Sequence, residues 1–268
     1  MPDWNNKVAL VTGGSTGLGF AIGEALGEQG AGVMLAARHS ARLQEAVEQL
    51  RQKGYRAVGF AADVTDSEQV ASLIAETNRE FGKLDILVNN VGRSTRGKAL
   101  DTSPDEFRDL MELNFLSVVR CTQAAAPHLI ESGGHVVNIG SLASKSVSKF
   151  LGAYPASKFA VAAYSQQLRY ELNPQGVHVL LVCPGPIARE DGGQRYDAET
   201  NGLPESAGKP GAGVRLRGIP PERLAAKILR ACKARRAELV VPSTARWLFA
   251  LSQLWPSFGD RVVKGMNS

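Results

Sequence analysis

Short apolar runs alternate with longer segments of helical periodicity along most of the chain. Runs that are apolar almost throughout, rather than at every second position, are typical of strands covered on both faces. The pattern predicts strands over Val8–Thr12, Gly32–Ala37, Arg56–Ala62, Leu84–Asn90, His135–Ile139, Val177–Cys183 and Glu238–Val241. Helical periodicity lies between them, over Phe20–Gln29, Ala41–Gln52, Ser67–Phe81, Pro104–Ile130 and Pro155–Leu172. The alternation predicts an α/β fold with a doubly wound parallel sheet of about seven strands and helices on both faces.

Residues at several helix boundaries support this pattern. Asp66 or Ser67 can cap the helix that follows, because both side chains accept hydrogen bonds from free backbone N–H groups. Gly82, Gly133 and Gly176 can end the helices before them, because glycine adopts the left-handed conformation without strain.

Composition and charge narrow the class of protein. A chain of 268 residues with 44% apolar and 21% charged residues suits one folded domain over residues 1–268. The net charge of +5 comes from scattered Lys and Arg without interleaved aromatics, so we expect no nucleic-acid partner. Cys121, Cys183 and Cys232 lie far apart, which predicts neither a disulfide nor a metal site. The N-terminal residues lack a signal-peptide pattern and no apolar stretch reaches the ~20 residues of a membrane span, so we expect a cytoplasmic protein.

Two segments depart from the alternating pattern. The stretch around 185–221 is rich in glycine and poor in apolar residues, and we interpret it as a substrate lid, with a tolerated surface insertion as the alternative. The C-terminal extension 243–268 contains the apolar segment Trp247–Trp255, in which residues 247, 251, 254 and 255 can share one helix face. That face can pack on its own domain, cover a subunit interface or make a peripheral contact with a membrane surface.

A glycine-rich turn follows the first strand and precedes a helix. Its sequence is Thr12-Gly13-Gly14-Ser15-Thr16-Gly17-Leu18-Gly19. Gly13, Gly17 and Gly19 lack the Cβ atoms that would hold a pyrophosphate away from the backbone, and the helix start offers free N–H groups to that anion. The turn therefore predicts a nucleotide site.

The end of the second strand indicates which nucleotide the site binds. A carboxylate there would bind the adenosine ribose 2′-hydroxyl of NAD, whereas an arginine would accept the 2′-phosphate of NADP. This chain has Arg38 and no carboxylate in Ala36-Ala37-Arg38-His39-Ser40. We therefore expect NADP rather than NAD, with Arg38 and possible help from Ser15 as the phosphate ligands. Alternatively, Arg38 is an ordinary solvated arginine.

Three polar residues in the second half of the chain suggest a catalytic site. Ser141 follows the strand His135–Ile139, and Tyr154 and Lys158 lie one helical turn apart. An ammonium group beside a phenol favours the phenolate, so we expect Lys158 to lower the pKa of Tyr154 and make it an acid or base nearer neutrality.

Together these motifs resemble the short-chain dehydrogenase/reductase family, in its branch of single-domain oxidoreductases. The resemblance covers about residues 7–190 and rests on Thr12-Gly-x-x-x-Gly-x-Gly19, Asn89-Asn90-Val91-Gly92, Asn114, Ser141 and Tyr154-x-x-x-Lys158. It implies a Rossmann-type sheet of seven strands and hydride transfer between a nicotinamide and a carbonyl or secondary alcohol substrate. Similar enzymes form homodimers or homotetramers, so a homo-oligomer is expected by the same resemblance.

The resemblance also implies a role for each catalytic residue. Tyr154 corresponds to the family's acid/base, and Ser141 to the residue that polarises the reacting oxygen. Lys158 corresponds to the lysine that holds the nicotinamide ribose, and Asn114 to the residue that positions a water in a proton relay. A catalytically silent protein that senses the nucleotide is the alternative function.

The remaining cofactor residues are implied in the same way. Asp63, followed by Val64, is similar to the family's aspartate near the adenine, and Asn90, Val91 and Gly92 lie along the cofactor. Val91 stands where the family commonly has Ala. Pro184, Gly185, Pro186 and Ile187 resemble the turn that meets the carboxamide, but Arg189 replaces the usual threonine beyond it.

Basic residues fall on loops at the expected ligand-binding edge of the sheet: Arg93, Arg96, Lys98, Lys145, Lys149 and Arg189. They can attract an anionic substrate, or they can simply keep the loops soluble.

Overall fold

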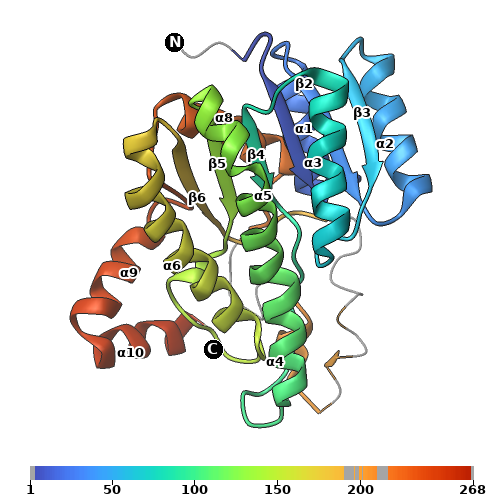
Figure 1. Cartoon of the computed structure of the whole chain (residues 1–268). Coiled ribbons are helices and arrows are strands. Elements are labelled where there is room, and N and C mark those ends of the chain that lie inside the picture. The colour runs from blue at the N-terminus through green and yellow to red at the C-terminus, as the bar shows by residue number, and fades with distance from the viewer. Residues whose placement is uncertain (1–3, 190–195, 197–198, 201, 210–216, 267–268) are drawn as a thin grey trace.

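The computed structural model describes residues 4–189, 196, 199–200, 202–209 and 217–266. Seven parallel strands form one sheet in the order β3-β2-β1-β4-β5-β6-β7 (Figure 1). Their bounds are β1 Val8–Thr12, β2 Gly32–Ala37, β3 Ala57–Ala61, β4 Ile86–Asn89, β5 His135–Ile139, β6 His178–Pro184 and β7 Glu238–Val241. The strand order reverses between β1 and β4, as in a Rossmann-type doubly wound sheet, which confirms the predicted fold class.

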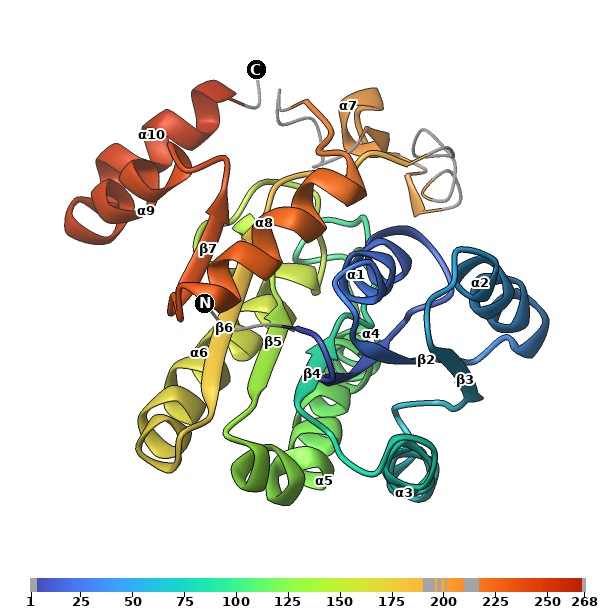
Figure 2. The ribbon, with the colours of Figure 1, turned by 90° about the horizontal axis from the view of Figure 1, so that it is seen from above.

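Helices cover both faces of the sheet (Figure 2). One face packs against α1 Gly17–Gly27, α2 Ser40–Gln52 and α8 Pro221–Lys233, and the other against α3 Ser67–Phe81, α5 Ser117–Ser132 and α6 Tyr154–Leu172. The predicted boundaries are confirmed: the side chain of Asp66 caps α3, and Gly82 and Gly133 end α3 and α5 at φ values of 79° and 57°. Gly176 likewise ends the turn after α6.

The helix predicted over Pro104–Ile130 is not continuous. It divides into α4 Pro104–Met111, a π-helical turn over Glu112–Leu116, and α5. The wider turn contains Asn114, whose side chain is buried and hydrogen-bonded to both backbone groups of Arg93. Contacts of this kind offset the poorer geometry of a π turn, a feature that is frequent at functional sites.

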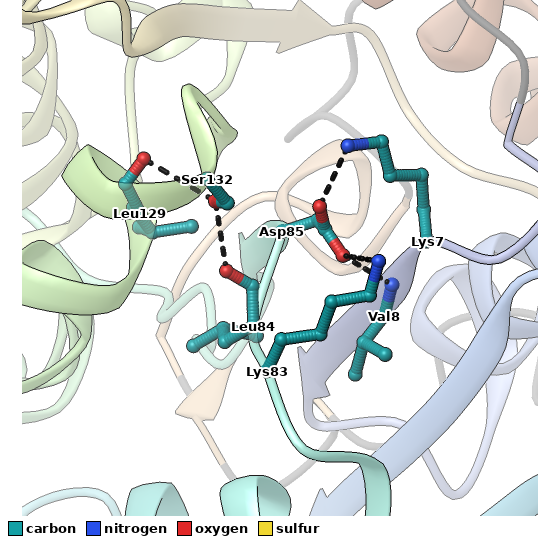
Figure 3. Close-up of polar contacts among 7 residues, drawn as sticks. All are labelled: Lys7, Val8, Lys83, Leu84, Asp85, Leu129 and Ser132. Atoms are coloured by element: carbon teal, nitrogen blue, oxygen red, sulfur yellow. Dashed lines mark hydrogen bonds and ion pairs between the residues drawn. The ribbon is translucent and has the colours of Figure 1, made fainter.

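A buried carboxylate holds the amino ends of the two central strands together (Figure 3). One oxygen of Asp85 accepts from Lys7 Nζ at 2.7 Å, and the other accepts from the backbone N–H of Val8 at 2.9 Å. Lys83 Nζ adds an ion pair at 3.4 Å. Because β1 and β4 are fixed in register from this end, their carboxyl ends, Thr12 and Asn89, emerge side by side.

The chain after β7 forms two helices, α9 Ala245–Leu254 and α10 Pro256–Met266, which extend beyond the sheet (Figure 1). The short helix α7, Glu205–Gly208, lies in the predicted lid segment, much of which falls outside the described residues. Within the described part of the chain, no helix combines the length and apolar character needed to cross a membrane.

Candidate active site

A cavity of about 770 Å³ lies at the carboxyl ends of the strands and runs from the glycine-rich turn to α9. Most of the predicted site residues line it: Gly13, Ser15, Thr16, Leu18, Arg38, Asp63, Val64, Asn90, Val91, Gly92, Ser141, Tyr154, Lys158, Pro184, Gly185 and Ile187. Four predicted residues are not in its wall, namely Thr12, Gly17, Gly19 and Asn114. Of these, Thr12, Gly19 and Asn114 contact residues of the wall from behind, as described below.

The glycine-rich turn is closely packed and needs its glycines. Gly13 and Gly17 have φ values of 63° and 56°, in the left-handed region that favours glycine. A Cβ atom on Gly19 would overlap the carbonyl oxygen of Gly13 and would lie 2.6 Å from Asn90 Nδ2. That amide also donates to the carbonyls of Thr12 and Gly13, at 3.0 and 3.1 Å. The side chain of Asn90 therefore fixes the turn from below.

The hydroxyl of Thr12 joins β1 to β4 at the same place. It donates to the carbonyl of Val88 at 3.2 Å and accepts from the backbone N–H of Asn90 at 3.0 Å. The side chain of Thr16, which precedes α1, makes no capping hydrogen bond. The first turn of α1 thus keeps the unsatisfied N–H groups and positive dipole end that favour an anion.

Arg38 lies at the carboxyl end of β2, on the rim of the cavity. Its side chain is 61% exposed, and its guanidinium is 3.9 Å from Asp63 Oδ2. Asp63 is itself fixed, because its other oxygen accepts from the backbone and the hydroxyl of Thr65 at 2.9 and 2.8 Å. The pair leaves most of the guanidinium's donors directed at solvent, where a phosphate could reach them.

Ser141, Tyr154 and Lys158 come together at the other end of the cavity. Ser141 follows β5, and its hydroxyl accepts from the N–H of Ala143 at 3.1 Å and is hydrogen-bonded to the phenol of Tyr154. Tyr154 is the first residue of α6, and Lys158 lies one turn further on. Lys158 is buried and Tyr154 is half-buried, so each side chain is poorly solvated when charged.

The expectation that Lys158 lowers the pKa of Tyr154 is wrong in this structure. Burial raises the pKa of Tyr154 to about 12, and the hydrogen bond with Ser141 only partly opposes that rise. Lys158 Nζ donates to the carbonyl of Ile139 at 2.8 Å and lies 6.0 Å from the centroid of the Tyr154 ring. Burial lowers the pKa of Lys158 to about 8. Desolvation is therefore the largest cause of the shift in both pKa values.

Asn114 approaches Lys158 from the π-helical turn. Its Oδ1 accepts from the N–H of Arg93 at 2.9 Å, and its Nδ2 donates to the Arg93 carbonyl and to Ser157 Oγ, both at 2.9 Å. A Cβ atom on Gly92 would lie 3.0 Å from Asn114 Oδ1 and 3.3 Å from Lys158 Nζ. Gly92 therefore allows the Asn114 amide and the Lys158 amine to lie close together. The proton relay through Asn114 stays a prediction.

Arg96 lines the cavity at the expected edge of the sheet, but its side chain is held within the protein. It is 6% exposed, and its guanidinium stacks on the ring of Tyr196 at 3.6 Å from the centroid. It donates to the carbonyls of Ala207 and Lys209 at 2.5 and 3.3 Å, and its backbone N–H donates to Glu199 Oε2 at 2.7 Å. Arg96 thus anchors the described part of the segment after β6 to the loop after β4.

Sequence reasoning missed Tyr196 and the cavity-facing side of α9. Tyr196 is buried and lines the cavity together with Leu248 and Phe249. No signal marks Tyr196 in its glycine-rich surroundings. Periodicity does mark Phe249, because it lies about 200° around the helix from Trp247 and so faces the opposite way.

A second polar cluster forms at the amino edge of the sheet, away from the cavity. His135 and His178 are register partners on β5 and β6, with their Nδ1 atoms 3.0 Å apart, and Cys232 completes a group whose ligand atoms lie within 4.8 Å. The approach of these two histidines and the cysteine is not among the predictions made from the sequence. The Nε2 of His178 donates to the carbonyl of Arg236 at 2.8 Å, so its Nδ1 accepts from His135. Burial lowers the pKa of His135 to about 3, which keeps this ring neutral.

Comparisons with known proteins agree with this architecture. A family model for the short chain dehydrogenases matches residues 7–199. The dehydrogenase/reductase SDR family member 7B of Danio rerio is 33% identical, over 98% of this chain and 86% of the relative.

Solved structures match as well. A variant of actinorhodin polyketide ketoreductase with NADPH is 28% identical, with a TM-score of 0.79 over 90% of this chain and 97% of the other. A short chain dehydrogenase/reductase from Burkholderia phymatum in complex with NAD has a TM-score of 0.81 over 95% and 96% of the two chains. At 24% identity, the latter match concerns the fold alone. Because the family model covers most of the chain and a relative above 30% identity covers nearly all of it, the chain belongs to the short-chain dehydrogenase/reductase family of oxidoreductases.

Proposed function

We propose that this protein transfers a hydride between NADP(H) and a carbonyl or secondary alcohol substrate, with Tyr154 as the acid/base. The observation that carries the proposal is the hydrogen-bonded pair of Ser141 and Tyr154, which lines one end of a cavity whose other end is the glycine-rich turn. A dinucleotide that spans this cavity would bring its reactive ring to the pair. A binding protein without catalysis would have no need for such a pair.

The residues present fit a dinucleotide. The glycine-rich turn leaves no room for a Cβ at position 19, and the first turn of α1 supplies N–H groups for a pyrophosphate. The nicotinamide would supply the hydride. All of the following residues line the cavity. We expect Asp63 and Val64 to meet the adenine, Asn90, Val91 and Gly92 the middle of the molecule, Lys158 the ribose, and Pro184, Gly185 and Ile187 the carboxamide.

The raised pKa of Tyr154 fixes its protonation state at neutral pH. With a pKa of about 12, the phenol keeps its proton at neutral pH and can deliver it to a carbonyl oxygen as that oxygen gains negative charge. The hydroxyl of Ser141, held by its own backbone contact, can donate a second hydrogen bond to the same oxygen. Donors fixed in a site that excludes water stabilise such an oxyanion most strongly.

Arg38 is the residue that we expect to select NADP. Arg38→Ala should weaken NADPH binding about tenfold or more, because a charge-assisted bond to the 2′-phosphate contributes roughly 1.5–3 kcal/mol. NADH binding should change little, because NADH lacks that phosphate. Titration of both nucleotides, followed by fluorescence, measures the ratio.

Arg42→Ala is a control for loss of a nearby surface charge, because Arg42 is exposed on α2 and does not line the cavity. Equal affinity of the unmodified protein for NADPH and NADH, unchanged in Arg38→Ala, would show that Arg38 does not read the phosphate.

The activity itself can be tested with a panel of carbonyl compounds. Ketones, quinones and 3-oxoacyl thioesters cover small, planar and carrier-linked substrates, and NADPH consumption is followed by absorbance. We expect turnover with at least one class. Tight NADPH binding with no turnover across the panel would instead favour a nucleotide-sensing protein.

A further inference from the structure

The helix α9 presents apolar side chains in two opposite directions. Leu248 and Phe249 line the cavity, and Phe249 is buried. Other large apolar side chains are exposed: Trp247 is 76% exposed, Leu254 68%, and Trp255, just past the end of the helix, 60%. Phe258, in the first turns of α10, is 48% exposed. We call these four exposed side chains the apolar patch.

The patch lies on a closely packed pair of helices. A Cβ atom on Gly259 of α10 would lie 2.6 Å from Ser252 Cα of α9, so the two backbones meet at that point without an intervening side chain. Figure 1 shows the pair extending from the end of β7 beyond the body of the domain. Close contact between the helices holds the patch as a formed surface. Four large exposed apolar side chains on one helix pair point to an interaction site.

The chemistry of the patch fits a lipid surface. Tryptophan is the side chain most suited to the membrane interface, because its ring is apolar and its N–H can remain hydrated. Residues 243–268 carry three basic residues, Arg246, Arg261 and Lys264, and one acidic residue, Asp260. Arg246 and Arg261 are exposed and flank the patch in the sequence. Apolar aromatic groups flanked by arginines are complementary to an anionic headgroup region.

A second copy of the chain fits less well. A two-fold interface would bring the patch against itself, together with the same flanking arginines and only one acidic residue from each chain to oppose them. The helices are also shorter than the ~20 residues that span a bilayer, so the contact is with the surface.

We propose that the α9–α10 pair docks the protein on an anionic phospholipid surface, with the apolar patch in the boundary between headgroups and acyl chains. The cavity wall formed by Leu248 and Phe249 then lies directly behind the docked face.

Vesicle flotation tests the proposal with the full chain. We expect the protein to float with vesicles of phosphatidylcholine mixed with phosphatidylglycerol, and much less with phosphatidylcholine alone or in high salt. The three tryptophans offer an independent signal. Trp4 is buried at 2% exposure, so a blue shift of the emission on vesicle addition reports Trp247 and Trp255.

The variant Trp247→Ser/Trp255→Ser should reduce the vesicle-bound fraction at least about tenfold. Tyr170→Ser is the matched control, because Tyr170 is an equally exposed aromatic on α6 and should leave binding unchanged. Circular dichroism and the thermal transition verify that both variants fold. Absence of flotation with the anionic vesicles, or flotation of the double variant equal to that of the unmodified protein, would overturn the proposal.

Sedimentation tests whether a second copy of the chain, rather than a membrane, covers the patch. If the unmodified chain is a dimer that Trp247→Ser/Trp255→Ser converts to a monomer, the patch is a subunit interface and the membrane proposal is wrong. We expect the same sedimentation for both. Because binding is measured without substrate, these outcomes do not depend on the proposed reaction.

Discussion

Tyr154→Phe is expected to lower kcat by about 10³-fold and to leave NADPH affinity within about twofold of the unmodified value. The change removes one oxygen, which is the proton donor of the proposed reaction, and general acid catalysis by a positioned side chain contributes roughly 10²–10⁴-fold. The ring itself stays, so the cavity keeps its shape. Steady-state kinetics with NADPH and the best carbonyl substrate measure the first effect, and nucleotide titration measures the second.

Tyr164→Phe is the matched control for this experiment. Tyr164 lies on the same helix, α6, and packs edge-on against Phe115 at 5.9 Å between centroids, but it does not line the cavity. Its loss of a hydroxyl should leave kcat nearly unchanged. A Tyr154→Phe variant that retains most of its activity would show that another group delivers the proton.

Gly19→Ala is expected to destabilise the protein by about 3 kcal/mol and to weaken NADPH binding about 100-fold. A methyl group at this position would overlap the carbonyl of Gly13 and press on Asn90 Nδ2 at 2.6 Å, so the turn must shift. Overpacking of a closely packed site costs roughly 1–3 kcal/mol. A displaced turn would also misalign the N–H groups for the pyrophosphate, each charge-assisted hydrogen bond being worth about 1.5–3 kcal/mol. Urea denaturation and nucleotide titration measure the two effects.

Gly208→Ala controls for the added methyl group. A Cβ atom on Gly208 would meet only Thr200 Cγ2 at 3.7 Å, an ordinary contact, so stability should change by less than about 0.5 kcal/mol. Unchanged nucleotide binding in Gly19→Ala would mean that the turn does not contact the cofactor closely.

The sheet and the position of the site could be predicted from the sequence because both follow from local patterns. Four of the seven strands have the predicted bounds, including Val8–Thr12 and His135–Ile139, since buried parallel strands are marked by continuous apolar runs. Parallel strands put their carboxyl ends at one edge. Residues that follow separate strands, such as Arg38 and Ser141, therefore had to meet at that edge.

The parts that could not be predicted depend on contacts between distant segments. Arg96 is followed by Gly97 in a loop and resembles a surface residue, but Tyr196 and the carbonyl of Ala207 bury it. The direction of the pKa shift of Tyr154 also could not be predicted from the spacing of the two residues. Residues four apart on a helix are close, yet the direction of Lys158 toward Ile139 and the burial of the phenol decide the sign of the pKa shift.

One missed feature had a readable signal. His135 and His178 are the first residues of two consecutive strands that pair in the sheet, and the observed register places them side by side. The predicted strand began one residue early, at Val177, so a comparison of first positions would have brought them together only after a shift of one residue. Cys232 would still have been missed, because it reaches them from α8, whose approach depends on the packing of α8 on α1.

The ten residues of α9 form a partition with a different neighbour on each side: Phe249 belongs to the cavity wall and Trp247 to the outer surface. A molecule bound on either side that shifts this partition alters the other side by the same free energy, whichever binds first. A molecule bound on the outer surface would therefore act across the width of one helix on the affinity for a molecule in the cavity.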